Sequence, residues 1–203
     1  MQSAIGRLWP LFSFGKRVPA SAEPLEEGMA AYQRGDYAAA LKFLRPLAKQ
    51  NNSQAQYTLG YMYAEGEGVP EHDGKAAKLY RKAAEQGDAD AQNELGVMYV
   101  AGRGVPADDA EAMKWFRKAA EQGLREAQYN LGLMNYIGEG VPQDLVQAHM
   151  WYNIADTLGD EDAQNGRDIA AIKMTPDQVT EAERLAREWI AKHQRSRLRV
   201  VPP

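Results

Sequence analysis

One stretch of this chain recurs at a fixed interval. Residues 91–123 read AQNELGVMYVAGRGVPADDAEAMKWFRKAAEQG, and close copies begin at residue 55 and at residue 127. Each copy opens on an Ala-Gln pair, and successive pairs lie 36 residues apart. The pairs are Ala55-Gln56, Ala91-Gln92, Ala127-Gln128 and Ala163-Gln164. A period of roughly 20–50 residues is typical of stacked repeats, so the chain is predicted to form a linear array.

Each unit contains two helical patterns joined by a Gly-x-Gly-Val-Pro loop. In the first full unit, apolar side chains at helical spacing predict helices over about residues 53–64 and 73–85. The proline cannot continue the first helix, and Asp108 and Asp144 follow it by two residues, where an N-cap is expected. The residues predicted to end helices in the left-handed conformation are Gly87, Gly123, Gly159 and, upstream, Asn51.

A Leu-Gly pair recurs inside each first helix, as in Leu95-Gly96. A helical glycine costs about 0.5–1 kcal/mol relative to alanine, so its repetition needs a structural reason. We expect close approach of the partner helix, in which Ala84 and its equivalents are also small.

The pattern AQxxLGxMY…GxGVPxD…AAEQG resembles the Sel1-like repeat, a relative of the tetratricopeptide repeat with a longer loop between its helices. Three full copies span residues 53–160, and residues 23–52 resemble a plain tetratricopeptide helix pair without that loop. Asn135 departs from the pattern, because tyrosine stands there in the other two copies. The resemblance implies an all-α fold, a right-handed α-solenoid of antiparallel helix pairs with a C-terminal capping helix.

The two ends of the chain differ from the array. Residues 1–22 combine three basic side chains, a short apolar run and an Ala-Ser-Ala sequence, which fits either a secretory signal or a disordered leader. The protein is therefore periplasmic or secreted in the first case and cytoplasmic in the second. No run approaches the roughly 20 apolar residues of a membrane span.

After residue 160 the repeat decays, and residues 161–193 are predicted to be C-terminal capping helices. Thr175-Pro176-Asp177-Gln178 supplies an N-cap, a first-turn proline and a capping-box partner for a helix over 176–193. A terminal helix with a polar outer face keeps such an array soluble. The basic residues 194–203 are predicted to be a solvated, disordered tail.

Composition and motifs argue against several functions. The net charge of −4 gives no electrostatic attraction to nucleic acid, and the lack of cysteine leaves no thiol nucleophile or thiolate metal site. The three histidines occupy non-equivalent positions in the array, and no hydrolase, zinc or nucleotide-binding motif occurs. We therefore expect no catalytic residue, no metal site and no cofactor. Trp115 and Trp151 recur at one repeat position, which predicts packing.

In arrays of the tetratricopeptide type, the first helix of each pair lines a concave groove. Carried over through the Leu-Gly pair, the resemblance implies a set of partner-binding residues at the groove. They are Met29, Tyr32, Tyr57, Tyr61, Asn93, Val97, Tyr129, Leu133 and Tyr136. Tyrosine offers large contact area with a hydrogen-bonding tip, which suits peptide recognition. Each tyrosine also fits the alternative of packing against the adjacent unit.

These observations predict a non-enzymatic adaptor or scaffold that binds a peptide or protein segment in the groove. Two alternatives stay open. One is a secreted cell-wall-ligand binder or hydrolase, of the kind suggested for relatives whose cysteine-stapled repeats have been linked to penicillin-type compounds, although the staples and an SxxK serine are missing here. The array can also act as an architectural spacer. The sequence does not identify the partner.

Overall fold

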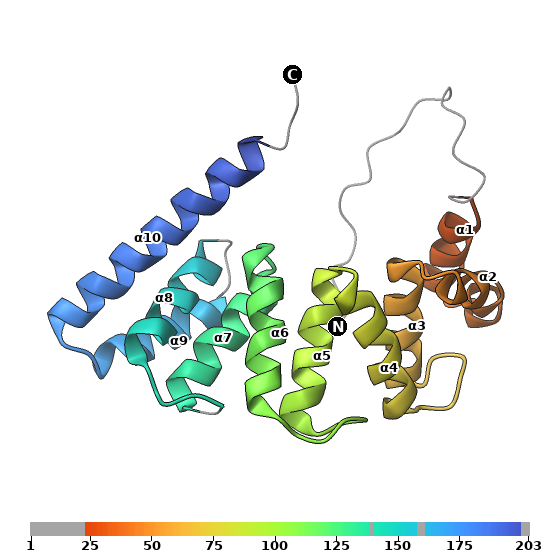
Figure 1. Cartoon of the computed structure of the whole chain (residues 1–203), viewed down its shortest axis with the longest axis horizontal. Helices are drawn as coiled ribbons and strands as arrows, with labels where there is room; N and C mark the ends of the chain where they lie inside the picture. The colour runs from red at the N-terminus through yellow and green to blue at the C-terminus, as the bar shows by residue number, and fades with distance from the viewer. Residues whose placement is uncertain (1–22, 139, 158–160, 200–203) are drawn as a thin grey trace.

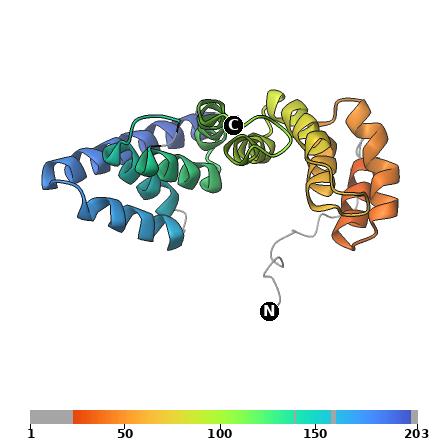
Figure 2. The same ribbon diagram turned by 90° about the horizontal axis from the view of Figure 1, so that it is seen from below.

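The structure is a computed structural model that describes residues 23–138, 140–157 and 161–199. In these residues it contains helices and no strand (Figure 1). The helices are α1 (Glu23–Gln33), α2 (Tyr37–Lys49), α3 (Ser53–Glu65), α4 (Asp73–Glu85), α5 (Ala89–Ala101), α6 (Asp109–Glu121), α7 (Arg125–Ile137), α8 (Leu145–Asp156), α9 (Glu161–Ile172) and α10 (Pro176–Arg199). They follow one another along the long axis from α1 at one end to α10 at the other (Figure 1 and Figure 2).

The helices pair in sequence order and form an α-solenoid. Each of α1, α3, α5 and α7 packs most extensively on the helix that follows it, and each of α2, α4 and α6 also packs on the next pair. We call α1, α3, α5, α7 and α9 the first helices, and α2, α4, α6 and α8 the second helices. Because each pair buries its apolar side chains against its neighbours, the core runs along the whole array.

The predicted N-caps of α6 and α8 and the predicted left-handed residues are confirmed where the structure describes them. Oδ1 of Asp108 accepts a hydrogen bond from the backbone N–H of Glu111 at 3.0 Å, and Asp144 caps α8 in the same way. His72, which precedes α4, makes no side-chain cap bond. The predicted left-handed residues Asn51, Gly87 and Gly123 all have positive φ, whereas Gly159 lies outside the described residues.

The glycine inside each of α3, α5 and α7 lies against an aromatic ring. A Cβ atom on Gly96 would lie 2.6 Å from the ring of Phe116, closer than real Cβ contacts. The equivalent pairs are Gly60–Tyr80, Gly96–Phe116 and Gly132–Tyr152. Close approach of the partner helix is therefore confirmed, and the side chain that approaches the glycine is a large ring.

The second glycine of each loop lies against the preceding unit. A Cβ atom on Gly104 would collide with the backbone of Asp73, the first residue of α4. The equivalent contacts are Gly68 with Tyr37 and Gly140 with Asp109, the first residues of α2 and α6. Each loop therefore stacks on the start of the previous second helix, and this contact excludes any side chain at that position.

A buried glutamine joins successive units. Gln92 donates from Nε2 to the backbone carbonyl of Ala84 at 3.0 Å, and its Oε1 accepts from Nε2 of Gln122 at 2.8 Å. Gln56 makes the same two contacts with Ala48 and Gln86. These glutamines satisfy carbonyl groups at the ends of second helices inside the core, where an unpaired carbonyl is costly.

The departure at Asn135 leaves the helix intact. The Asn135 side chain is buried and donates from Nδ2 to the carbonyl of Leu131 at 2.7 Å. Its backbone carbonyl accepts from the N–H of Asp144 at 2.9 Å, as that of Tyr63 does from His72 at 2.8 Å. The polar side chain is thus satisfied within its own helix, so α7 keeps the bounds of the pattern.

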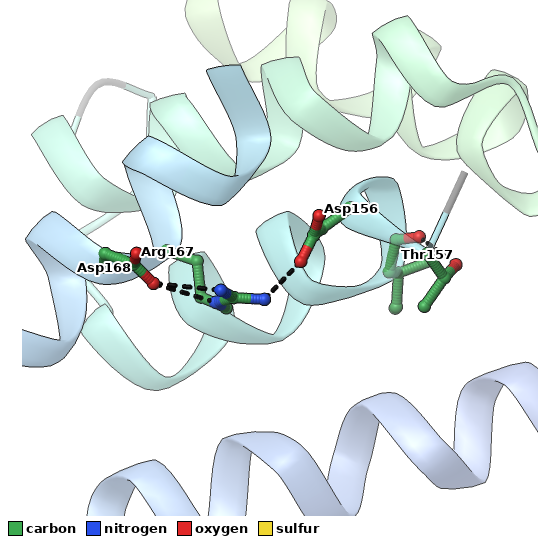
Figure 3. A network of polar contacts seen from close by, with 5 residues as sticks. Asp156, Thr157, Arg167 and Asp168 are labelled. Atoms are coloured by element: carbon green, nitrogen blue, oxygen red, sulfur yellow. Dashed lines mark hydrogen bonds and ion pairs between the residues drawn. The ribbon is translucent and has the colours of Figure 1, made fainter. Parts of the chain in front are cut away.

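Two helices close the array. An ion-pair group joins α9 to the end of α8, because Arg167 contacts both Asp156 of α8 and its own neighbour Asp168 (Figure 3). Next to Asp156, Oγ1 of Thr157 donates a hydrogen bond to the carbonyl of Ile154. Helix α10 packs across α8, with the rings of Trp189 and Trp151 5.7 Å apart.

Helix α10 begins as predicted and ends later than predicted. Thr175 N–H donates to Oε1 of Gln178 at 2.9 Å, and Gln178 N–H donates back to Oγ1 of Thr175 at 3.3 Å, which completes the capping box. The helix then continues to Arg199, so residues 194–199 are helical and not a disordered tail. No glycine or proline occurs between Pro176 and Pro202, and nothing in that sequence ends the helix at His193.

Candidate functional site

The predicted binding residues lie on four first helices. Met29 and Tyr32 belong to α1, Tyr57 and Tyr61 to α3, Asn93 and Val97 to α5, and Tyr129, Leu133 and Tyr136 to α7. Direct contacts join α1 to α3 and α5 to α7. Thr58 donates from Oγ1 to the Met29 sulfur at 3.3 Å, and Asn130 donates from Nδ2 to Oδ1 of Asn93 at 3.0 Å. We call the surface of these helices, with α9, the first-helix face.

The predicted residues differ in how much of them reaches solvent. Tyr61 and Val97 are 37% and 39% exposed, whereas Asn93 is only 7% exposed. The half-buried rings of Tyr57 and Tyr129 lie 5.8 Å from Tyr80 and 5.6 Å from Tyr152 respectively. These two tyrosines therefore contribute to packing within their units as well as to the surface, and Asn93 offers little of itself to a partner.

One apolar position is repeated on four of the five first helices. Tyr61, Val97, Leu133 and Ile169 stand 36 residues apart on α3, α5, α7 and α9, and Ile169 is 49% exposed. We call these four residues the apolar ridge. Over the described residues, every exposed large hydrophobic side chain lies on a first helix. They are Tyr61, Val97, Val100, Ile137, Ile169 and Ile172.

Sequence reasoning missed the last part of this surface. Ile169 and Ile172 of α9 are exposed, and Lys173, which follows α9, places its Nζ 4.5 Å from the ring centre of Tyr136. The loss of the Leu-Gly pair in α9 hid their equivalence. The signal was nevertheless present, because Ala163-Gln164 keeps the 36-residue period and counting from it places Ile169 in register with Leu133.

Charge is divided between the two kinds of helix. Helices α1, α3 and α5 contain no lysine or arginine, and their described acidic side chains are Glu26, Glu27, Glu65, Asp90 and Glu94. Their partners α2, α4 and α6 contain ten basic side chains: Lys42, Arg45, Lys49, Lys75, Lys78, Arg81, Lys82, Lys114, Arg117 and Lys118. On α1, α3 and α5 the first-helix face is therefore apolar and acidic, whereas α7 and α9 each contain one arginine, Arg125 and Arg167.

The acids of α5 lie close to other acids. Burial raises the pKa of Glu94, and the charges of Asp90 and Glu65 add to this effect, against a hydrogen bond from Asn93 and the charge of Arg103, which lower it. Burial likewise raises the pKa of Asp90, with further contributions from Asp88 and Glu126. The negative charge on this face is therefore only partly compensated within the described structure.

A separate cavity of about 450 Å³ opens beside α6, on the second-helix side. Trp115 contributes to its wall, with the Lys118 ammonium 4.1 Å from the ring centre, and Gly140 and Val141 of the next loop complete it. Trp115 is half-buried and packed against the core. The charged lining of the cavity includes Lys114 and Glu111, which form an ion pair with each other.

The described residues contain neither a metal-site cluster nor a membrane-spanning helix. No group of three or more histidine, aspartate or glutamate side chains there has the arrangement of a metal site. Among the helices of that part of the chain, none has the length and hydropathy needed to cross a membrane.

The sequence profile of the Sel1 repeat matches residues 25–52, 53–88, 89–124 and 125–160, which is most of the chain. The chain belongs to the Sel1 repeat family. Sel1 repeats are typical of proteins that act through protein–protein contacts and are generally non-enzymatic. The first match covers α1 and α2, which are joined only by residues 34–36 and so lack the long loop.

Two solved structures of Sel1 repeat proteins are similar to this one. A Sel1 repeat protein from Oxalobacter formigenes is 37% identical, with a TM-score of 0.66, over 70% of this chain and 58% of that one. A protective antigen of uropathogenic Escherichia coli with an SLR fold is 29% identical, with a TM-score of 0.60, over 90% of this chain and 49% of that one. This chain thus spans about half the length of these relatives. No curated protein matches it.

Proposed function

We propose that this Sel1 repeat protein is a non-enzymatic adaptor that holds a protein or peptide segment of a partner on its first-helix face. The observation that carries the proposal is the apolar ridge, one partly exposed apolar side chain on each of four consecutive first helices. Exposed apolar side chains are ordinary when scattered over a surface, but their recurrence at one repeat position on successive helices favours an interaction surface.

The ridge residues Tyr61 and Val97 are much more exposed than the core leucines of the same helices. Leu59 and Leu95, on the opposite side of their helices, are almost fully buried, whereas Tyr61 and Val97 remain exposed. Burying apolar side chains against a partner gains roughly 25 cal/mol per Å² before the cost of association. A row of such side chains on rigid helices presents them to an extended or helical segment without the cost of ordering a loop.

The test is an affinity capture that uses the full chain as bait. The ridge variant carries Tyr61→Ser, Val97→Ser and Ile169→Ser, which remove exposed side chains and leave Tyr57 and Tyr129 in their packed positions. The control variant carries Lys42→Ser, Lys78→Ser and Arg117→Ser on exposed positions of the second helices. Circular dichroism establishes that each variant retains its helices.

We expect a partner protein that the wild-type chain and the control variant retain and that the ridge variant loses. Equal retention by the ridge variant would place the binding site on another surface and contradict the proposal. Retention of no protein by the wild-type chain, under conditions in which the bait stays folded, would contradict the adaptor function itself.

A further inference from the structure

We propose that the segment bound on the first-helix face is cationic, and that one of its lysine or arginine side chains pairs with Glu94 of α5. The inference rests on the proposed function and deepens it, because it assigns a chemical class to the partner. It is carried by the charge division between the helices and by the surroundings of Glu94.

The first-helix face offers a partner negative charge next to apolar contact. Helices α3 and α5 contribute Glu65, Asp90 and Glu94 and contain no lysine or arginine. The only basic side chain of α7 is Arg125, which pairs with Glu126 on its own helix at 3.3 Å. A cationic segment is therefore attracted to this face, whereas an acidic one is repelled.

Glu94 is specific to its unit. The equivalent residues of the neighbouring units are Thr58 and Asn130, 36 residues away on either side. Thr58 bonds to the backbone of its own helix, and Asn130 bonds to Asn93. These uncharged residues fill the position without any carboxylate, so the packing of the array does not require an acid there.

The Glu94 carboxylate is half-buried and weakly compensated. Its hydrogen bond is from Nδ2 of Asn93 at 3.4 Å, beyond the usual range for a strong bond. Arg103 is the cation whose charge acts on it, but the Arg103 guanidinium is already bonded to Asp73 at 2.8 and 3.3 Å. Partly desolvating a carboxylate without a close cation is unfavourable, and a cation brought by a partner removes that penalty.

Aromatic rings of α3 belong to the same face. Tyr57 and Tyr61 stand on α3, the first helix that precedes α5 in the array. Burial raises the pKa of both phenols, and the Glu94 charge adds to this effect, after Glu65 and Glu67 in the case of Tyr61. The face of a tyrosine ring attracts lysine and arginine, and the apolar stems of those side chains can lie along Val97 of the ridge. A lysine or arginine thus satisfies the carboxylate and the apolar surface together.

The experiment selects ligands without assuming their sequence. A phage-displayed library of random dodecapeptides is selected on the immobilised full chain, and one enriched peptide is synthesised. Its affinity is measured by fluorescence anisotropy for the wild type, for the ridge variant, for Glu94→Gln, and for Glu121→Gln as a matched control on α6. A second peptide, in which the enriched lysine or arginine is replaced by methionine, completes a double-mutant cycle.

We expect enriched peptides to contain lysine or arginine beside apolar residues. Glu94→Gln should weaken binding about tenfold, and the methionine peptide should then lose little more, because both changes remove one interaction. Glu121→Gln should leave the affinity unchanged. Peptides that depend on the ridge but lack a basic residue, or that bind Glu94→Gln as well as the wild type, would overturn the inference and leave the proposed function standing.

Two other experimental results also test the inference. Failure to enrich any peptide that needs the ridge counts against the proposed function as well as against this inference. Concentration-dependent dimerisation of the chain by analytical ultracentrifugation, lost in Glu94→Gln and without peptide enrichment, would replace the peptide by the basic second helices of another copy and so overturn the inference.

Discussion

Nε2 of Gln122 donates a hydrogen bond to Oε1 of Gln92 over 2.8 Å, at the junction where the ends of two second helices meet. Gln92 in turn donates to the carbonyl of Ala84 at the end of α4. A single buried carboxamide therefore connects α4 to α6, and each of its two polar atoms has one partner. The next unit differs: Leu158 stands in the sequence where Gln122 is expected, and Oε1 of Gln128 has no hydrogen-bond partner among the described residues.

Replacing Gln122 by leucine should destabilise the array by about 1–3 kcal/mol, because it leaves the buried Oε1 of Gln92 without a donor. Equilibrium unfolding in urea, followed by circular dichroism, measures the change. Gln54→Leu, at an exposed position of α3, is the control and should change stability by less than about 0.5 kcal/mol. Equal effects of the two substitutions would show that the Gln92–Gln122 contact contributes nothing to stability.

Replacement by alanine should destabilise the protein at Gly96 of α5 and stabilise it at Gly74 of α4. Gly96→Ala places a methyl group 2.6 Å from the Phe116 ring and should cost about 1–3 kcal/mol through overpacking. Gly74→Ala, in the first turn of α4, meets its nearest atom, of His72, at 3.4 Å and should stabilise by about 0.5–1 kcal/mol. Thermal unfolding of both variants measures the difference. Stabilisation by Gly96→Ala would contradict the packing described for the helix pair.

The loop glycine Gly104 combines two constraints. It has φ of 69°, and its Cα approaches the backbone of Asp73 so closely that a Cβ atom cannot fit. Gly35 has a similar φ of 74°, but a methyl group added there would meet no atom within 4 Å. We expect Gly35→Ala to cost about 1 kcal/mol from backbone strain and Gly104→Ala to cost clearly more. Similar urea midpoints for the two variants would show that the loop does not stack on the preceding unit.

His149 makes stability depend on pH. It is buried in α8 with Nδ1 unpartnered, and burial lowers its pKa below the ordinary 6.5, as does the charge of Arg167. The charges of Glu183 and Asp168 act in the opposite direction. Because the unfolded chain binds this proton more readily, the contribution is fully present above about pH 6.5 and is lost as the pH falls below it.

The measurement for His149 is urea unfolding from about pH 7.5 to pH 5.5. His149→Met removes the titrating group at similar volume, so the variant should lose less stability than the wild type over this range. Other groups, including Asp90 and Glu94, titrate equally in both proteins and cancel in the comparison. Parallel stability curves would contradict the buried, neutral state of His149.

The period made most of the fold predictable. The predicted second helix over 73–85 is α4, and the capping residues Asp108, Asp144 and Thr175 act as expected. These features depend on local backbone preferences, which the sequence of one unit contains. The partner of Gly96 was not predictable in the same way, because it depends on how two helices rotate against each other.

The surface was only partly predictable. The face that carries Tyr61 and Val97 followed from the repeat register, but the exposure of each side chain depends on the next unit along the array. Tyr57 faces the ring of Tyr80, whereas Ile169 has no following unit to cover it. The charge division becomes meaningful only when the first and second helices are known to form different faces.

The most direct test of the first-helix face as the binding surface is photocrosslinking from the full chain. A benzophenone amino acid is introduced at Val97, on the apolar ridge, or at Arg117, on the exposed side of α6. If the first-helix face holds the partner, the chain labelled at 97 should form a discrete crosslinked product with it on irradiation, and the chain labelled at 117 should not. A product formed from position 117 and not from position 97 would contradict the central claim and move the binding surface to the second helices.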